Sequence, residues 1–391
     1  MSVEDLRSER IKNLVDALSF KEPEKVPVGA EIISWPFSYA GVSYVDIMDD
    51  PQAVADAYLK FLDVIELDFL WGGGLNTPVK AVQALGNTSY RIADDGVTAQ
   101  HVQAELDFMT ADEYPELIAN PDAFALKRQR ATMPILDLPR DQAYAKVIEA
   151  LKEFDTFSQA NALIQKFIFE DKQIIPLTGA PVGFQTPLNT LFDSYRGMRD
   201  TLLDLKRRPE TVREVFDLLM IKARERMAGL DPKDFTDPYP LGMTGYHVEC
   251  FLSPPLFDEY FFDPFMELCL PYMEAGLKFF IKGEGHFLNT IDRYRKLPKG
   301  SCVFMLDQDD PFEAYKAIGD WQSLATGITV DLLQTGSVSQ CVDFVKRSFD
   351  TFAPGGGFIF MQNKPLLCGD DAKAENLIAA YETANELSLQ K

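Results

Sequence analysis

The stretch FFIKGEGHFLNT, residues 279–290, places three reactive side chains beside an apolar run. Its first half is typical of a buried strand. Lys282, Glu284 and His286 then follow on alternate positions among glycines. Because residues two apart on a strand point the same way, Lys282 and Glu284 can pair with each other. The same side chains can instead hold a ligand, so an ion pair and a binding site are both open at this point.

Further reactive side chains follow three other apolar runs that we expect to be strands. They are His247 and Glu249 after TGY, Asp307, Asp309 and Asp310 after CVFML, and Lys364 and Cys368 after GGFIFMQN. In a barrel of parallel strands, the turns at the carboxyl ends converge on one mouth. His247, Glu284 and Cys368 would then form a zinc set, since three protein ligands and an open position are the catalytic pattern. The chain has no CxxC, HxxxH or HExxH spacing, and Cys368 can equally be a small buried residue or an exposed thiol.

Two other groups of residues admit a binding role and a structural one. The aspartates of DQDDPF (307–312) can hold magnesium, but we favour Asp310 as the N-cap of a helix that starts at Pro311. We leave Asp307 open. The aromatic residues after the first predicted strand and after GAPVG would give a pocket apolar walls, and packing of long loops explains them equally well. These aromatic residues are Trp35, Phe37, Tyr39 and Phe184.

The elements that position these residues have a regular rhythm from about residue 236 onward. Five apolar runs, each followed by a helical pattern, predict parallel strands covered by helices. With the earlier strands the number approaches eight. We therefore predict an α/β fold, a (β/α)8 TIM barrel with an N-terminal helix and a helical insertion at about 105–170, in one domain spanning 1–391. An open doubly wound sheet is the alternative, although the chain has no GxGxxG motif and no P-loop.

Charge and composition exclude several classes of partner. The 60 acidic and 38 basic residues give a net charge of −22, which disfavours nucleic acid and anionic membrane surfaces. No apolar run is long enough to cross a bilayer, and the charged start has no signal-peptide core. We expect a cytoplasmic protein. Its five cysteines, an odd number, indicate thiols instead of a disulfide framework.

Four stretches of the chain carry a resemblance to a known family. They are RIKNLVDALSFKEPEKVPV, FDSYRGMRDTLLDLKRRPETV, LSPPLFDEYFFDPFMEL and GGGFIF with CGDDAKAENLIAA. From about residue 8 to the C-terminus the chain resembles the uroporphyrinogen decarboxylase superfamily, whose members are (β/α)8 barrels. The decarboxylases place arginines after the first strand, where this chain reads AEIISWPFSYAG without arginine. Decarboxylation of a porphyrinogen is therefore not expected, because the carboxylates of that substrate would lack their arginine partners.

The resemblance points to the other branch of the superfamily, which transfers methyl groups to or from a corrinoid protein with the help of zinc. Those members carry His-x-Cys-Gly where this chain has Lys282, Glu284 and Gly285, and a further cysteine that Cys368 matches. The altered set resembles the methyltransferase I components of O-demethylase systems. It implies a zinc ion held by Glu284, Cys368 and His247, with Lys282 and His286 next to these ligands.

The expected activity is zinc-dependent transfer of a methyl group from a small donor, such as a methoxylated aromatic compound, to a corrinoid (cobalamin) cobalt carried by a partner protein. The residues expected to act in catalysis are Glu284, Asp307 and Lys282. The helical insertion and the barrel mouth would dock the corrinoid protein transiently, and a homodimer and a monomer are both open. Two alternatives stay open as well: methyl transfer from a corrinoid to a thiol, and a barrel that binds a ligand or partner without catalysis.

Overall fold

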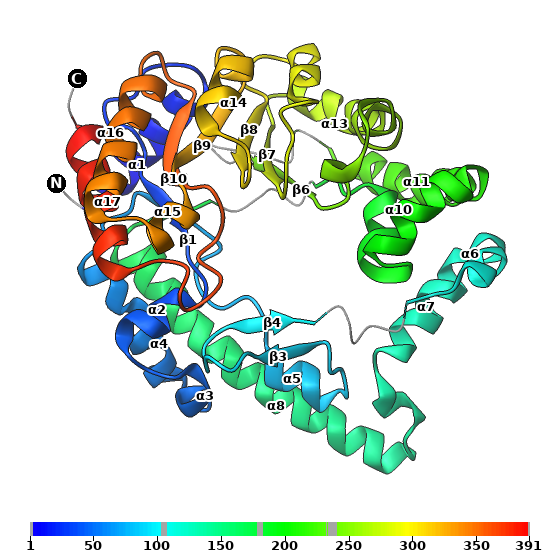
Figure 1. Ribbon diagram of the computed structural model, residues 1–391. Coiled ribbons are helices and arrows are strands. Elements are labelled where there is room, and N and C mark those ends of the chain that lie inside the picture. Colours follow the sequence, from blue (N-terminus) through cyan, green and yellow to red (C-terminus); the bar gives the residue numbers. More distant parts are fainter. Residues whose placement is uncertain (1–2, 103–107, 178–182, 232, 234–240, 390–391) are drawn as a thin grey trace. The chain divides into compact units, whose positions relative to one another are not determined.

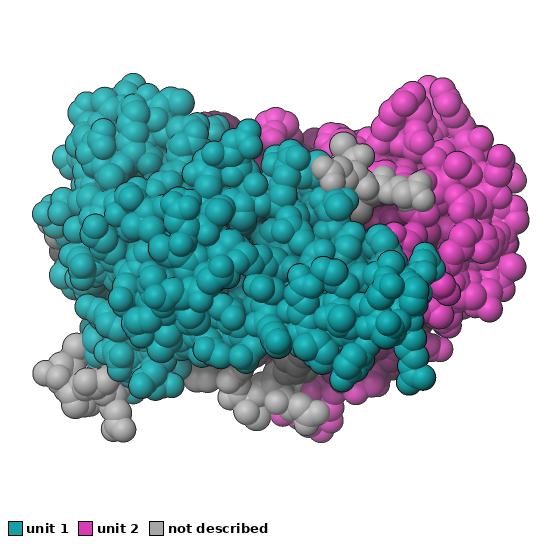
Figure 2. All heavy atoms as spheres, turned by 90° about the horizontal axis from the view of Figure 1, so that it is seen from below, with its two compact units in different colours: residues 1–106, 132–178, 325–391 teal, residues 107–131, 179–324 magenta. Residues whose placement is uncertain are grey.

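The computed structural model describes residues 3–102, 108–177, 183–231, 233 and 241–389 (Figure 1). The fold is mixed α/β, with parallel sheets and many helices. The chain divides into two compact units, which Figure 2 shows in different colours. Unit 1 comprises residues 1–106, 132–178 and 325–391, and unit 2 comprises residues 107–131 and 179–324.

Unit 1 is built on short parallel strands. Strand β1 (Gly29–Glu31) pairs with β2 (Phe69–Trp71), and β2 pairs with β5 (Ile175–Pro176). Strand β10 (Phe358–Gln362) joins the residue before β1 through a parallel bridge between Val28 and Phe360. The antiparallel hairpin of β3 (Tyr90–Ile92) and β4 (Ala99–His101) forms around Asp95 and Gly96.

The helices of unit 1 come from all three of its chain segments. They are α1 (Val3–Leu18), α2 (Trp35–Ala40), α3 (Tyr44–Ile47), α4 (Pro51–Leu59), η1 (Lys60–Asp63), α5 (Val79–Ala84), η4 (Pro134–Asp137), α8 (Arg140–Gln165), η5 (Lys166–Asp171), α15 (Val330–Thr335), α16 (Val338–Phe352) and α17 (Ala374–Ser388). Helices α16 and α17 lie side by side. Helix α1 is the N-terminal helix that the sequence predicts.

Unit 2 is built on the parallel strands β6 (Leu241–Tyr246), β7 (Lys278–Gly283) and β8 (Cys302–Leu306), with β8 pairing to the start of β9 (Ser323–Ile328). Its helices are η3 (Ala111–Glu113), α6 (Tyr114–Ala119), α7 (Pro121–Ala131), α9 (Pro187–Thr190), η6 (Leu191–Tyr195), α10 (Met198–Arg207), α11 (Pro209–Ala228), η8 (Glu249–Phe251), α12 (Pro254–Phe257), η9 (Asp258–Phe262), α13 (Asp263–Glu274), η10 (Ile291–Lys296) and α14 (Pro311–Ile318).

An aromatic cluster forms the core of unit 2. The ring of Phe265 stacks on Phe261 with centroids 5.4 Å apart and meets Phe279 of β7 edge-on at 5.5 Å. Tyr246 of β6 meets Phe261 edge-on at 4.4 Å. All four side chains are buried. Such pairs add to the stabilisation from apolar burial, so the last residue of β6 and the start of β7 are held against η9 and α13.

The rhythm of strands and helices predicted from residue 236 onward is confirmed. Each predicted strand appears as β6 to β10, and a helix follows each one. The segment LNTIDRYRKL forms the 3-10 helix η10. Asp310 is the N-cap of α14, because its carboxylate accepts hydrogen bonds from the N–H groups of Phe312 and Glu313. The prediction of a cap at this position was therefore correct.

The closed barrel that the sequence predicts is not shown. The described strands form a sheet of three, in the order β1-β2-β5, and a sheet of five, in the order β10-β9-β8-β7-β6. Residues 178–182, which follow β5, lie outside the described part of the chain. No helix among the described residues is long and apolar enough to cross a membrane. All five cysteines are free thiols, as their odd number predicts.

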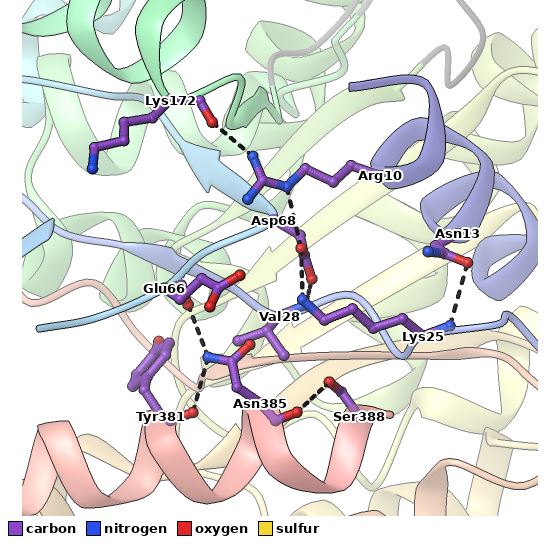
Figure 3. A network of polar contacts seen from close by, with 10 residues as sticks. All are labelled: Arg10, Asn13, Lys25, Val28, Glu66, Asp68, Lys172, Tyr381, Asn385 and Ser388. Carbon is purple, nitrogen blue, oxygen red and sulfur yellow. Dashed lines mark hydrogen bonds and ion pairs between the residues drawn. The ribbon is translucent and has the colours of Figure 1, made fainter. Parts of the chain in front are cut away.

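The buried carboxylate of Asp68 joins several segments of unit 1 (Figure 3). It accepts hydrogen bonds from Arg10 Nε of α1 at 3.3 Å, from Lys25 Nζ at 2.9 Å and from the N–H of Val28 at 3.0 Å. Arg10 also donates from Nη1 to the carbonyl oxygen of Lys172 at 2.8 Å. Asp68 thus holds the N-terminal helix and the approach to β1 against the start of β2.

Replacing Asp68 tests this role. We expect Asp68→Asn to lower the free energy of unfolding by about 3–5 kcal/mol, because it leaves buried cations without their counter-charge. Urea denaturation followed by circular dichroism measures this loss. Asp331→Asn is the control: it breaks an exposed ion pair with Lys364 and should cost under about 1 kcal/mol. Equal small losses of unfolding free energy in both variants would show that the buried contacts of Asp68 stabilise the fold no more than an exposed ion pair does.

Candidate functional site

The register of three strands in unit 2 places three polar residues at one edge of the sheet. Tyr246 pairs with Gly283, and Gly283 pairs with Leu306. The next residues along the chain are His247, Glu284 and Asp307. The backbone pairing continues past the strands, since the N–H of Glu284 donates to Tyr246 O at 3.3 Å and the N–H of Asp307 donates to Gly283 O at 3.2 Å. The carboxyl ends of these neighbouring parallel strands therefore bring the three residues to one edge of the sheet, as predicted.

His247 lies between two carboxylates. Its Nδ1 is 3.0 Å from Asp193 Oδ2, and its Nε2 is 3.6 Å from Glu284 Oε1. The hydrogen bond to Asp193 raises the pKa of His247 to about 9, and the charges of Asp193, Glu284 and Glu249 act in the same direction against partial burial. His247 therefore carries its proton at neutral pH in this arrangement. A carboxylate on Nδ1 also fixes the orientation of the ring, so that Nε2 faces Glu284.

A third carboxylate, that of Glu249, is buried next to the backbone of the histidine. It accepts a hydrogen bond from the N–H of His247 at 2.9 Å and one from Asn189 Nδ2 at 3.1 Å. Burial raises the pKa of Glu249 to about 8 although both donors favour its charged form. Asn189 also accepts the N–H of Val248 through Oδ1 at 3.0 Å. These bonds hold the turn after β6 in one conformation and so position His247.

The turn after β7 is held from the neighbouring strand and packed against a cysteine. Asp307 Oδ1 accepts the N–H of Gly285 at 2.8 Å. Gly285 has a φ of 116°, and a Cβ added there would lie 2.6 Å from Cys250 Cβ, so only glycine fits. Burial raises the pKa of the Cys250 thiol to about 11, and the thiol donates to His247 O at 3.4 Å. Cys250 is thus a neutral sulfur at the edge of this cluster.

The other two residues of the opening motif take different positions. Lys282 is half-buried on β7, between Gly245 of β6 and Met305 of β8. His286 is exposed, and its Nδ1 lies 3.3 Å from Asp309 Oδ1. The hydrogen bonds and ion pairs of His286 and His247 thus involve different carboxylates.

The predicted residues of unit 1 gather around helix α2. Trp35 stacks on Tyr39, with ring centroids 5.2 Å apart, and its Nε1 donates to Ala372 O at 2.7 Å. The N–H of Cys368 donates to Asp371 Oδ2 at 2.6 Å, and burial raises the pKa of the Cys368 thiol. The loop from Cys368 to Ala372 is therefore anchored to α2. Of the three predicted zinc donors, only His247 and Glu284 belong to unit 2.

Two of the predicted pocket walls are core residues. Phe37 is fully buried, with its ring centroid 5.0 Å from that of Tyr44 and 6.0 Å from that of Tyr58. Phe184, in unit 2, is buried against Phe261 and Phe265. Packing accounts for both rings, and their contact with a substrate stays a prediction.

The pair of His247 and Glu284 fits neighbouring positions of a zinc site. Two donors about 2.0–2.1 Å from a tetrahedral zinc ion lie roughly 3.4 Å apart, and Nε2 and Oε1 are 3.6 Å apart here. Asp193 on Nδ1 is the outer partner that metal-binding histidines usually have. Within the described ranges, no group of three His, Cys, Asp or Glu side chains is arranged to hold a metal ion. Unit 2 therefore supplies two fitting donors, which is fewer than a catalytic zinc needs.

Sequence reasoning missed Asn189, Asp193 and Cys250. Asn189 and Asp193 come from α9 and η6, more than fifty residues before His247. Asp193 lies inside FDSYRG, a stretch that carries the family resemblance, which is the one signal that singles it out. Cys250 lies three residues after His247, but the sequence indicates no more than that it is one of five thiols.

In fold, the chain is similar to a solved structure described as a methyltransferase from Methanosarcina mazei. The TM-score is 0.54, the sequence identity is 14%, and the match covers 96% of this chain and 98% of that chain. The likeness therefore extends over nearly the whole length of both proteins and concerns the fold. No protein-family model matches the chain, and no curated protein matches it.

Removing the carboxylate on Nδ1 tests the geometry around His247. We expect Asp193→Asn to lower the pKa of His247 from about 9 toward 6.5, because the bond to Asp193 is the main cause of the shift. The pair stabilises the folded protein below about pH 6.5, and this contribution is lost as the pH rises through about 9. NMR titration measures the change, since the chain has only three histidines.

Asp309→Asn, beside His286, is the matched control and should leave the pKa of His247 unchanged. An unchanged titration of His247 in Asp193→Asn would contradict the contact between Nδ1 and Asp193.

Proposed function

We propose that this protein is a zinc-dependent methyltransferase that acts with a corrinoid protein. It would move a methyl group from a small donor, such as a methoxylated aromatic compound, to cobalt. The C–O bond of the ether breaks, the phenolate keeps that electron pair, and cobalt(I) supplies the pair for the new C–Co bond. The observation that carries the proposal is the pairing of His247 Nε2 with Glu284 Oε1 at the ends of adjacent strands. The solved structure of similar fold is described as a methyltransferase, which supports the proposed type of reaction.

The proposed zinc ligands are His247, Glu284 and Cys368. Bound zinc would supply a Lewis acid for the ether oxygen and so stabilise the leaving phenolate. Asp193 holds the proton on Nδ1 of His247, so that Nε2 is the nitrogen offered to a metal. The proton on Nε2 and the proton on the Cys368 thiol must leave when a metal binds, which makes its affinity depend on pH.

Lys282 and Asp307 have supporting roles in this proposal. The ammonium group of Lys282 would balance negative charge on the departing oxygen. Asp307 holds the N–H of Gly285 and thereby the position of Glu284. Trp35, Phe37, Tyr39 and Phe184 would give the substrate apolar surroundings.

The remaining parts of the proposal concern architecture and setting. We infer a closed (β/α)8 barrel in one domain spanning 1–391, with the helical insertion at about 105–170 as part of the dock for the corrinoid protein. That encounter would be transient, because the corrinoid protein must leave with its methyl group. A cytoplasmic location belongs to the same proposal and is consistent with five free thiols.

The activity is tested with purified protein, zinc, cob(I)alamin and 2-methoxyphenol. We expect about one zinc per chain, conversion of cob(I)alamin to methylcobalamin seen by absorbance, and release of catechol seen by chromatography. His247→Ala and Glu284→Ala should each lower both zinc content and rate by more than about tenfold.

His286→Ala is the matched control, because its ring contacts Asp309 and lies outside the proposed ligand set. It should retain zinc and rate. Zinc-loaded protein that transfers no methyl group from any of a panel of methoxylated aromatics, or full activity in Glu284→Ala, would contradict the proposal.

A further inference from the structure

Helix α8 carries an exposed apolar stripe. Tyr144, Val147, Leu151 and Phe154 are exposed by 67%, 37%, 58% and 50%. Their spacing of three, four and three residues is that of a coiled-coil seam. At 3.6 residues per turn the four side chains fall within a band about 80° wide. One side of a long helix therefore presents large apolar groups to solvent.

The stripe borders the face by which α8 joins unit 1, but its four side chains stay exposed. Helix α8 lies beside α4 and α5 (Figure 1), and its buried residues are Ala150, Ala160 and Ile164. The side chain of Asn161, which lies two turns after Phe154 and within about 20° of it around the helix, bonds the backbone of Leu75. The contacts that hold the helix in its unit thus leave the stripe uncovered.

The apolar surface is large for a chain that functions alone. Leu136 and Leu138, directly before the helix, are exposed by 50% and 40%. Together with the stripe they expose on the order of 500 Å² of apolar surface, in the upper part of the range for the largest patch on a monomer. Two such surfaces facing each other bury on the order of 1,000 Å², which a specific interface must reach.

We propose that α8 pairs antiparallel with α8 of a second copy of this chain. A twofold axis midway between Val147 and Leu151 sets Tyr144 against Phe154 of the other copy and Val147 against Leu151 of the other copy. Each of these two contacts then occurs twice, once on each side of the axis, as an isologous interface requires. The pairing joins four aromatic and four aliphatic side chains in layers of matching size. This proposal is independent of methyl transfer.

The charges at the ends of the stripe fit this register. Arg140 lies in line with the stripe, about one turn before Tyr144, and Asp155 lies at the edge of the stripe next to Phe154, so the two charges stand at opposite ends of the stripe. Antiparallel pairing brings Arg140 of one copy within a helical turn of Asp155 of the other, and symmetry makes this contact twice. Asp155 is exposed and accepts a hydrogen bond from Gln159 Nε2 of its own helix. A parallel pairing would place like charges together at each end, so the charges favour the antiparallel arrangement.

Sedimentation velocity of the full chain over a range of concentrations tests the interface. We expect a dimer that dissociates on dilution, and we expect Leu151→Glu to raise its Kd by at least about thirtyfold, because two carboxylates enter the apolar seam. Leu163→Glu is the control. Leu163 is also exposed, by 37%, but lies on another side of α8. The dimer Kd of Leu163→Glu should therefore equal that of the parent protein. Circular dichroism confirms that each variant is folded.

Charge reversal tests the register. Arg140→Asp and Asp155→Arg should each weaken the dimer by about fivefold at low salt, and the double variant should restore the parent Kd. A monomer at all concentrations would overturn the proposal, including the case in which the stripe binds a different protein. Equal effects of Leu151→Glu and Leu163→Glu, or a double variant weaker than both single ones, would overturn it as well.

Discussion

The candidate site depends on the in-register parallel pairing of β6, β7 and β8. Tyr246, Gly283 and Leu306 are paired in register across the three strands. The residues that follow them, His247, Glu284 and Asp307, therefore lie at the same edge of the sheet. A shift of one residue in any of these strands would turn its side chains to the other face. The aromatic core under β6 and β7 opposes such a shift, since Tyr246 and Phe279 each pack against rings of η9 and α13.

Charge balance gives the site its second property. Two carboxylates, those of Asp193 and Glu284, flank the imidazole of His247 in a chain of net charge −22. This excess of negative charge holds a proton on His247, whose pKa is raised to about 9 by the Asp193 hydrogen bond. A divalent cation satisfies the same carboxylates and competes with that proton. In the proposed function, a metal bound at the pair of His247 and Glu284 would take the place of that proton.

The sequence predicts the parts of this site that follow from local patterns and from one topological rule. Apolar runs that are each followed by a helical pattern locate β6 to β10. Because the carboxyl ends of parallel strands lie at one edge of a sheet, the sequence also places His247 next to Glu284. Asn189 and Asp193 are beyond such reasoning, because contacts between residues more than fifty positions apart leave no trace in periodicity. Phe37 and Phe184 follow predicted strands as pocket walls would, and both are buried among other rings. Composition cannot distinguish a pocket wall from a core residue, so their contact with a substrate stays a prediction.

The most direct test of the central claim is X-ray absorption at the zinc edge, measured on protein that carries one zinc per chain. The proposed ligand set of His247, Glu284 and Cys368 predicts a single sulfur at about 2.3 Å and nitrogen or oxygen neighbours at about 2.0–2.2 Å. The sulfur signal should disappear in Cys368→Ala and persist in Cys250→Ala. A spectrum without sulfur, or a sulfur signal that Cys250→Ala removes, would contradict the set and assign the metal to a different group of residues.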